Sequence, residues 1–435
     1  MPMMALTSKR SGALSALALT TVSALLLTGC ASGGDAPSAE AGPVTLEFWG
    51  WAPGLETAVE LWNEENPNTQ IEFFRMTGDD GAKIPAAIDA GTAPDVVQMS
   101  VHSIPGHIIN NRLTDISEYT EGLEEQFTAS SWKGVSYNDG VYAIPQDSGP
   151  TGLMYRKDLF EQHGVEVPTT WDEYLDAARA LKEADPELHI AQFSPNETGL
   201  WLETVWQNEG TWYGIDGDAW TVGIDNEASQ EVAEVWQTLL DEDLVKVVDM
   251  WTPEYWAEVN AGTIATINYA AWFPGLLEES AGDLAGKWAV APSPRYDGLD
   301  TAGETGGSVD VIPEGTEHVE QAVEFTTWLN SSPEALEILI TEGGLFPSAL
   351  TGLESESLLQ PEEYFGGQVI NEVFAGEATK VPDTWVEGPS FDLAQDQLKD
   401  AFAQVANGKL TFAEALTQVQ ESTVQDLKDM GLNVK

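Results

Sequence analysis

Cysteine and basic residues are both scarce in this sequence, and each scarcity excludes a class of protein. The chain of 435 residues has one cysteine, Cys30. A single cysteine can form neither an intrachain disulfide nor a cysteine-based zinc site. Lys and Arg together number 18 against 72 Asp and Glu, which gives a formal net charge of −54. Such an acidic chain repels nucleic acid and anionic lipid headgroups, so we expect neither as a partner.

Sequence signatures of catalysis are also missing. There is no G-x-S-x-G elbow and no Walker A loop, because Gly408-Lys409 is followed by leucine. The five histidines form neither H-E-x-x-H nor an i, i+4 pair, so we predict no metal and no cofactor. A glycosidase needs only two placed carboxylates, and among 72 acidic residues such pairs are common. A secreted glycosidase therefore stays as the alternative to a protein that binds without catalysis.

Long hydrophobic runs are confined to the N-terminus. The uncharged, mostly apolar segment 11–27 follows Lys9 and Arg10 and leads into Thr28-Gly29-Cys30. No other stretch approaches ~18 consecutive apolar residues, the length of a membrane span. This pattern predicts a signal peptide over residues 1–29. Leu-Thr-Gly-Cys resembles the bacterial lipobox, in which the cysteine is acylated, and a plain secretory signal or an uncleaved anchor is the alternative.

The segment that follows is built from small and polar residues with prolines. Residues 30–43 cannot bury apolar area, so we interpret them as a lipidated Cys30 followed by a flexible tether. The sequence thus predicts a protein that works outside the cell membrane while a lipid on Cys30 holds it there.

From residue 44 onward the sequence alternates between strand and helix patterns. The order strand, helix, strand, helix, strand over 44–99 predicts an α/β fold with a parallel sheet covered by helices. Thr170 and Glu173 fit a capping box at the start of a further helix. Expected helices are 55–65, 83–90, 170–184, 229–240, 318–329, 333–341, 393–405 and 412–430, and expected strands are 44–49, 70–75, 94–99, 141–144, 263–267, 288–291 and 309–312.

Aromatic residues carry most of the information about a ligand. Sugar rings present flat C–H faces that pack on aromatic rings, and their hydroxyls need polar partners. Sixteen tryptophans are present, several of them in segments expected to be loops. The aromatic candidates for sugar binding are Trp49, Trp51, Trp201, Tyr269, Trp272 and Trp385. Asp147, just after Tyr142-Ala143-Ile144-Pro145, is a candidate polar partner. Packing in the core is the alternative for every tryptophan, above all for those on helix faces such as Trp236.

Five passages carry a resemblance to a known family. They are 44–51 (VTLEFWGW), 89–98 (DAGTAPDVVQ), 140–160 (GVYAIPQDSGPTGLMYRKDLF), 167–181 (VPTTWDEYLDAARAL) and 262–272 (GTIATINYAAW), with weaker echoes at 344–348 and 408–415. In this order they resemble the large extracellular sugar-binding proteins of ABC importers, the group that contains maltose-binding and glycerol-3-phosphate-binding proteins. One departure is Thr266, where relatives commonly have methionine.

The resemblance implies a two-lobed, periplasmic-binding-protein-like α/β fold, with interleaved lobes and a ligand cleft between them. Residues 44–149 with 306–345 would form one lobe, and 150–305 with 346–435 the other. Three chain crossings are expected near Gly149–Thr151, Gly303–Gly307 and Gly343–Pro347.

The resemblance also implies which residues reach the ligand and what the protein does. It adds Asp80, after the second strand, and Gly307, in the second crossing, to the candidates. The complete set of expected ligand-binding residues is Trp49, Trp51, Asp80, Asp147, Trp201, Tyr269, Trp272, Gly307 and Trp385. The expected function is to capture a carbohydrate, an oligosaccharide in particular, and to deliver it as a monomer to the permease of an ABC importer. A non-sugar solute such as glycerol 3-phosphate is the alternative ligand.

Overall fold

The computed structural model of the protein describes residues 43–76 and 83–435, so the expected signal peptide, Cys30 and Asp80 lie outside the described residues. The helices are α1 Leu55–Glu65, α2 Lys83–Asp89, α3 Ile104–Ile109, α4 Ala129–Gly134, α5 Lys157–His163, α6 Trp171–Ala184, α7 Gly199–Gln207, α8 Glu227–Asp241, α9 Pro253–Ala261, α10 Phe273–Ser280, α11 Val319–Ser331, α12 Pro333–Gly343, α13 Leu350–Leu353, α14 Ile370–Ala378, α15 Phe391–Ala406 and α16 Phe412–Asp429. The strands are β1 Val44–Gly50, β2 Thr69–Arg75, β3 Val96–Ser100, β4 Ser136–Tyr137, β5 Gly140–Val141, β6 Ala143–Pro145, β7 Thr151–Arg156, β8 Ala191–Phe193, β9 Tyr213–Asp216, β10 Ala219–Val222, β11 Val245–Val247, β12 Thr266–Ala270, β13 Trp288–Pro292 and β14 Ser308–Val311.

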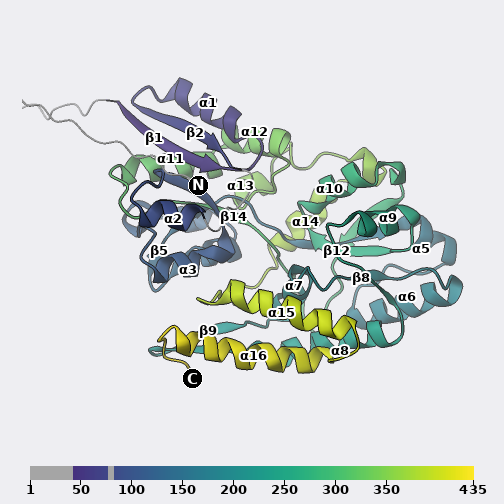
Figure 1. Cartoon of the computed structure of the whole chain (residues 1–435). Helices are drawn as coiled ribbons and strands as arrows, with labels where there is room; N and C mark the ends of the chain where they lie inside the picture. The colour runs from purple at the N-terminus through teal and green to yellow at the C-terminus, as the bar shows by residue number, and fades with distance from the viewer. Residues whose placement is uncertain (1–42, 77–82) are drawn as a thin grey trace, which may run out of the picture. The chain divides into compact units, whose positions relative to one another are not determined.

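A five-stranded sheet in the order β2-β1-β3-β14-β6 organises the N-terminal part of the chain. β1 runs parallel to β2 and β3, as the alternation of strands and helices predicts. β14 is antiparallel to both of its neighbours, β3 and β6, so the sheet is mixed rather than parallel throughout. A strand from far along the sequence therefore completes a sheet that the first strands begin. In Figure 1 α1 lies beside β2, and α12 packs against α1.

The remaining strands form smaller sheets. β7 lies between β12 and β13 in an antiparallel sheet, while β8 pairs with β11 in parallel and β9 pairs with β10 in a hairpin. α15 and α16 lie side by side, coloured yellow in Figure 1, and α8 packs against α16. The strand expected at 263–267 begins three residues later, as β12, because the segment before it pairs with His189 only through an isolated bridge.

Helix boundaries follow from local side-chain chemistry. The helix expected at 55–65 is confirmed residue for residue as α1. At α6, the Thr170 side chain accepts a hydrogen bond from the Glu173 N–H. The Glu173 carboxylate, however, accepts from the N–H of Thr169 rather than of Thr170, so the capping box expected there is incomplete. The complete capping box stands at α16, between Thr411 and Glu414, where both reciprocal bonds form.

Three glycine-containing segments far apart in the sequence run side by side. The Thr151 N–H donates to the Gly303 carbonyl at 2.9 Å, the Thr305 N–H to the Gly149 carbonyl at 2.9 Å, and the Ser148 N–H to the Phe346 carbonyl at 3.0 Å. A side chain at Gly149 would put its Cβ 1.9 Å from the carbonyl oxygen of Thr305, so only glycine allows this approach. These are the segments for which the sequence predicts chain crossings.

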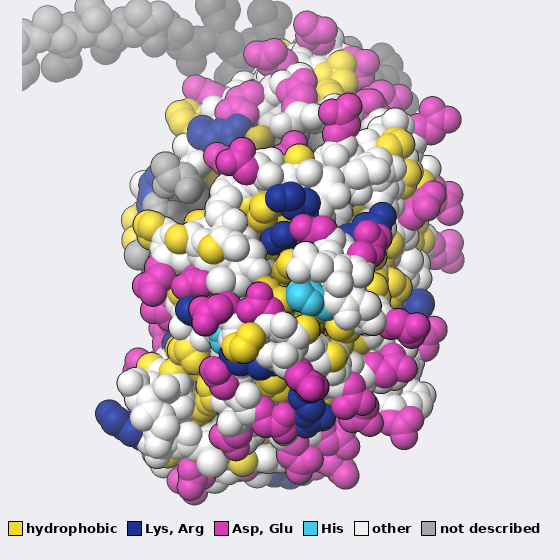
Figure 2. Space-filling view, turned by 90° about the vertical axis from the view of Figure 1, so that its right-hand side faces the viewer, with side chains coloured by type: hydrophobic (Ala, Val, Ile, Leu, Met, Phe, Trp, Pro, Cys, Tyr) yellow, Lys and Arg dark blue, Asp and Glu magenta, His cyan; other side chains and the backbone are white. Residues whose placement is uncertain are grey.

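Acidic side chains cover much of the surface. Figure 2 shows Asp and Glu scattered over the face it presents, with few Lys and Arg among them. Among the described residues, none of the helices has both the length and the apolar character needed to cross a membrane.

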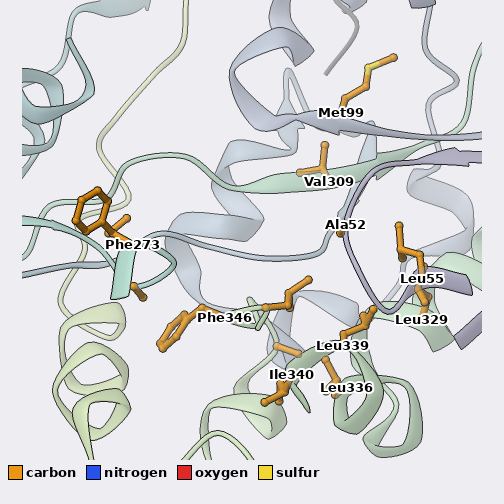
Figure 3. Close-up of a cluster of buried hydrophobic side chains, with 14 of the residues drawn as sticks. Ala52, Leu55, Met99, Phe273, Val309, Leu329, Leu336, Leu339, Ile340 and Phe346 are labelled. Carbon is orange, nitrogen blue, oxygen red and sulfur yellow. The ribbon is translucent and has the colours of Figure 1, made fainter. Parts of the chain in front are cut away.

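Two hydrophobic clusters form the interior. One joins the five-stranded sheet to α1, α11 and α12 and extends to Phe273 and Phe346; Figure 3 draws part of it, with Leu55, Leu329 and Leu339 close together. The other gathers buried side chains of α6, α7, α8, α15 and α16. Because the first cluster passes through the crossing segments, packing there fixes the walls of the cavity described next.

Candidate ligand-binding site

A cavity lies over the crossing segments. It has two chambers, each lined by aromatic and acidic side chains. Both chambers are lined by His102, Trp206, Glu304, Gly306 and Trp385, so they adjoin. The short 3₁₀ helix η1 (Val101–Ser103), which follows β3, provides His102, α7 provides Trp206, and the segment between α14 and α15 provides Trp385. Residues from distant parts of the sequence thus share one cavity.

Aromatic rings form two stacked groups in the cavity wall. Trp206 stacks on Trp385 with ring centroids 5.5 Å apart and planes at 21°. Trp272 stacks on Trp251 at 6.2 Å and 24°, and the ring of Tyr269 meets Trp272 edge-on at 5.0 Å. Such paired rings are held in fixed orientation, and the partly exposed Trp206 and Trp272 are the rings that can offer an apolar face to the cavity.

Two glycines leave space for the Trp272 ring and allow the close approach of the crossing segments. Gly306 and Gly307 have φ values of 85° and 111°, in the region that favours glycine. A Cβ at Gly306 would lie 3.1 Å from Nε1 of Trp272, and one at Gly307 would lie 3.2 Å from the carbonyl oxygen of Asp147. Any larger residue at Gly306 would strain the backbone and press on the Trp272 ring.

Two of the acids that line the cavity have raised pKa values. Burial raises the pKa of Glu304 to about 7, although hydrogen bonds from Ser130 and the Gly149 N–H act in the opposite direction. Burial also raises the pKa of Asp147, while the side chain and backbone N–H of Ser308 donate hydrogen bonds that stabilise its carboxylate. Both carboxyls are therefore held in the wall at defined positions.

His102 and Glu387 meet across the cavity. Nδ1 of His102 donates to Oε1 of Glu387, and the His102 ring stacks on Phe391 at 5.3 Å and 29°. Desolvation alone would lower the pKa of His102, but the charge and hydrogen bond of Glu387, with smaller contributions from Asp392 and Glu304, give a raised value. The pair therefore favours a protonated histidine.

Carboxylates outnumber basic groups around the cavity. The acids in its wall are Asp147, Glu197, Glu304, Asp383 and Glu387, and the basic side chains are His102 and Lys133. This balance suits hydroxyl donors and disfavours a phosphate group, whose binding sites present Arg, Lys or backbone N–H groups. Over residues 43–76 and 83–435, no cluster of three His, Cys, Asp or Glu side chains is arranged to hold a metal ion.

The structure brings most of the described candidate residues together. Asp147 and Gly307 line the first chamber, Tyr269 and Trp272 line the second, and Trp385 lines both. Tyr269 and Trp385 are nevertheless almost fully buried, at 3% and 7% exposure, and only an edge of each ring can reach the cavity.

Trp201 is a correction to the sequence analysis. Its segment is helix α7 rather than a loop, and its ring is 2% exposed, stacked on Phe412 at 5.3 Å and 10° inside the second hydrophobic cluster. One turn or so further along the same helix, Trp206 faces the cavity instead.

Trp49 and Trp51 also lie apart from the two chambers. Trp49 belongs to β1, where Lys83 Nζ sits 4.7 Å from its ring centroid and its Nε1 donates to Glu47 at 2.6 Å. The Trp51 N–H donates to Gln98 at 2.7 Å. Neither tryptophan is among the described residues that line the chambers.

Sequence analysis missed several residues of the wall. His102 lies just after β3, and ligand contacts gather at the ends of parallel strands in open α/β sheets. Its place after a predicted strand could therefore have indicated a ligand contact. Trp206 stood in the aromatic segment that includes Trp201. Nothing in the sequence distinguishes Glu304 and Glu387 from the many other acidic residues of this chain, so neither could be predicted as part of the site.

Comparison with known proteins gives one family model and several relatives. The family model described as bacterial extracellular solute-binding protein matches residues 50–335. The lactose-binding protein of Rhizobium radiobacter is 27% identical over 369 residues, which cover 79% of this chain and 84% of that protein.

Two solved structures extend the likeness to the fold. The galacto-N-biose-/lacto-N-biose I-binding protein of an ABC transporter from Bifidobacterium longum, in complex with lacto-N-biose, superposes with a TM-score of 0.81 at 26% identity, covering 91% of this chain and all of that one. The ABC transporter associated binding protein from B. animalis subsp. lactis, in complex with β-1,6-galactobiose, gives 0.76 at 26% identity, with the same coverage. The expected two-lobed α/β fold is thereby confirmed.

Proposed function

Because the chain belongs to the family of bacterial extracellular solute-binding proteins, we propose that it captures a carbohydrate outside the membrane and delivers it to the permease of an ABC importer. The observation that carries this proposal is the cavity over the crossing segments, where stacked tryptophans and carboxylates face the same space. Aromatic faces suit the C–H faces of sugar rings, and carboxylates accept hydrogen bonds from hydroxyl groups.

The ligand class we favour is a short oligosaccharide that contains galactose. Three of the relatives are named for lactose, lacto-N-biose and β-1,6-galactobiose, each of which contains that sugar.

Ligand capture follows from a change in population between open and closed forms. We assign residues 44–149 with 306–345 to one lobe and 150–305 with 346–435 to the other, with the hydrogen-bonded crossing segments as the hinge. A saccharide that touches both walls favours the closed form by its differential contacts, and the permease then recognises that form. No bond is made or broken in this cycle, and the protein acts as a monomer.

The anchor is a second part of the proposal. A lipid on Cys30 would hold the protein at the outer face of the membrane, and residues 31–43 would tether the folded part to it. Cys30→Ala should leave the protein in the soluble fraction of cells fractionated after expression, because no helix in residues 43–76 and 83–435 could cross the membrane. A variant that remains in the membrane after a high-salt wash would contradict the anchor.

A titration series tests the function itself. Purified protein is titrated calorimetrically with lactose, lacto-N-biose, β-1,6-galactobiose and glycerol 3-phosphate, and its melting temperature is recorded with each. A ligand at 100 times its Kd stabilises the native state by about 2.7 kcal/mol, which raises the melting temperature. We expect one or more of the saccharides to bind and to be recovered intact. Binding of glycerol 3-phosphate alone would overturn the carbohydrate assignment, and hydrolysis of a bound saccharide would favour the glycosidase.

A further inference from the structure

Glu387 is a buried carboxylate in the cavity wall with one oxygen left free. The residue is 4% exposed. Its Oε1 accepts two hydrogen bonds, one from Nδ1 of His102 and one from Nε1 of Trp385 at 3.1 Å. Its Oε2 is buried and has no hydrogen-bond partner among the residues that the structure describes. A buried polar atom without a partner costs free energy, so a donor that reaches this oxygen through a small shift of its neighbours is favoured.

The surroundings of Glu387 fix its orientation. Trp385, two residues earlier, stacks on Trp206 and points its Nε1 at the carboxylate, while Phe391 stacks on the ring of His102. The Trp206–Trp385 pair, in which Trp206 is the more exposed ring, and the carboxylate are thus held next to each other. This is the pair of features that a sugar ring with a free hydroxyl needs.

His102 reaches Glu387 from the other wall of the cavity. It belongs to η1, directly after β3 of the five-stranded sheet, whereas Glu387 lies between α14 and α15. If the walls separate when the cleft opens, the two side chains separate with them. The pair therefore forms only when the two walls are as close together as they are in this structure.

We propose that Glu387 is a ligand-binding residue whose Oε2 accepts a saccharide hydroxyl, and that His102 is the positioning residue that holds the carboxylate across the closed cavity. This inference rests on the proposed function and adds to it a named acceptor and a link between binding and pH.

The charges around His102 determine whether the affinity for the saccharide rises or falls with pH. Glu387, Asp392 of α15 and Glu304 face the ring and raise the pKa of His102 above its usual value near 6.5, against the desolvation that would lower it. Because the closed form binds this proton more tightly than a form with the walls apart, closure takes up a proton. The contribution of His102 to affinity is therefore complete below about pH 6.5 and falls as the pH rises through the raised pKa.

Glu304 acts in the same direction as His102. Its pKa is raised by burial from its usual value near 4.5 to about 7, so closure also favours its protonated form, and this contribution to affinity is lost as the pH rises from about 4.5 to about 7. The other charged groups of the first chamber are Lys133, Asp147 and Asp383. Lys133 and Asp383 are exposed, so water screens them.

The test measures affinity for lactose and β-1,6-galactobiose by calorimetry between pH 6 and 8.5. Glu387→Gln should weaken binding about 10- to 100-fold, since hydrogen bonds to a charged group are the strong ones. His102→Ala should weaken binding several-fold at pH 6, and His102→Asn, which restores an N–H donor without a titrating ring, should regain much of the affinity. The pH dependence of wild-type binding should be reduced in both histidine variants.

A matched His–carboxylate pair serves as the control. His189 Nε2 lies 3.8 Å from Oδ1 of Asp243, and neither residue lines the chambers. His189→Asn and Asp243→Asn should change neither the affinity nor its pH dependence. Wild-type binding with full affinity in Glu387→Gln, or an unchanged pH profile in His102→Asn, would overturn this inference and leave the proposed function standing. Failure of the wild type to bind either saccharide or any other would overturn both.

Discussion

At the scale of single residues, Trp272 is the clearest test of how the cavity holds a ligand. Its ring is half-buried, stacks on Trp251 and lines the second chamber. Trp272→Ala should cost about 2–4 kcal/mol of binding free energy, which is ~30- to 1,000-fold in affinity, with little loss of stability. Calorimetric titration and thermal melting of the same variant check both parts.

The control for Trp272 is a tryptophan with the opposite surroundings. Trp236 of α8 packs in the second hydrophobic cluster, and its replacement by alanine should cost about 3–5 kcal/mol of folding stability. Affinity in the folded fraction should stay the same. If Trp272→Ala instead behaves like Trp236→Ala, Trp272 is a packing residue.

Asp310 is a single buried carboxyl group that should make the stability of the protein depend on pH. It is fully buried in β14, and its Oδ2 accepts hydrogen bonds from Asn330 at 2.7 Å and from Gln146 at 3.1 Å. Burial raises its pKa to about 7, so the folded state disfavours the ionised form. The unfolded chain ionises near pH 3.9, and the resulting penalty therefore grows as the pH rises from about 4 to about 7.

Asp310→Asn should remove that penalty, because an amide oxygen can accept the same two hydrogen bonds. The stability of the variant relative to wild type should increase by about 3–4 kcal/mol between pH 4 and pH 7 and then level off. Urea unfolding of both proteins across this pH range measures the difference. A difference that does not change with pH would mean that Asp310 is ionised in the folded protein.

At the scale of elements, the capping box of α16 is a local device whose strength can be measured. The Thr411 side chain accepts from the Glu414 N–H at 3.2 Å, and Glu414 accepts from the Thr411 N–H at 2.9 Å. Thr411→Ala leaves N–H groups of the first turn unpaired and should cost about 1 kcal/mol. Thr417→Ala, exposed on the same helix, should cost nothing, because alanine is the better helix former. Equal melting temperatures of the two variants would contradict this.

At the scale of the whole molecule, the net charge of −54 is the dominant electrostatic property. Like charges on a folded surface repel one another and destabilise the compact state, and salt screens this repulsion. Stability in urea should therefore increase as sodium chloride is raised from about 0.01 to 1 M, over which the Debye length falls from about 30 to 3 Å. The increase should shrink at pH 4, where many carboxylates are protonated. Stability independent of salt at pH 7 would show that the charges are paired locally.

The sequence by itself determined several of the elements and their kind. Periodic apolar residues and caps gave α1, α6 and α16 close to their observed bounds, because these signals act within a few residues of the helix they define. Aromatic residues outside regular helices, together with the ordered family motifs, pointed to Trp272, Trp385 and Asp147, which do line the cavity.

Only the tertiary structure decided which side chains share the cavity. β14 pairs antiparallel with β3, more than two hundred residues before it, and with β6, about 160 residues before it, and no local pattern predicts these neighbours. Trp201 and Trp206 lie on one helix, but the packing of α7 against α8, together with the stacking on Phe412, sends the first ring into the interior and leaves the second in the cavity wall. His102 and Glu387 are 285 residues apart and become partners only because the two walls fold toward each other. Contacts of such long range depend on how whole elements pack, and that information is absent from any short stretch of the chain.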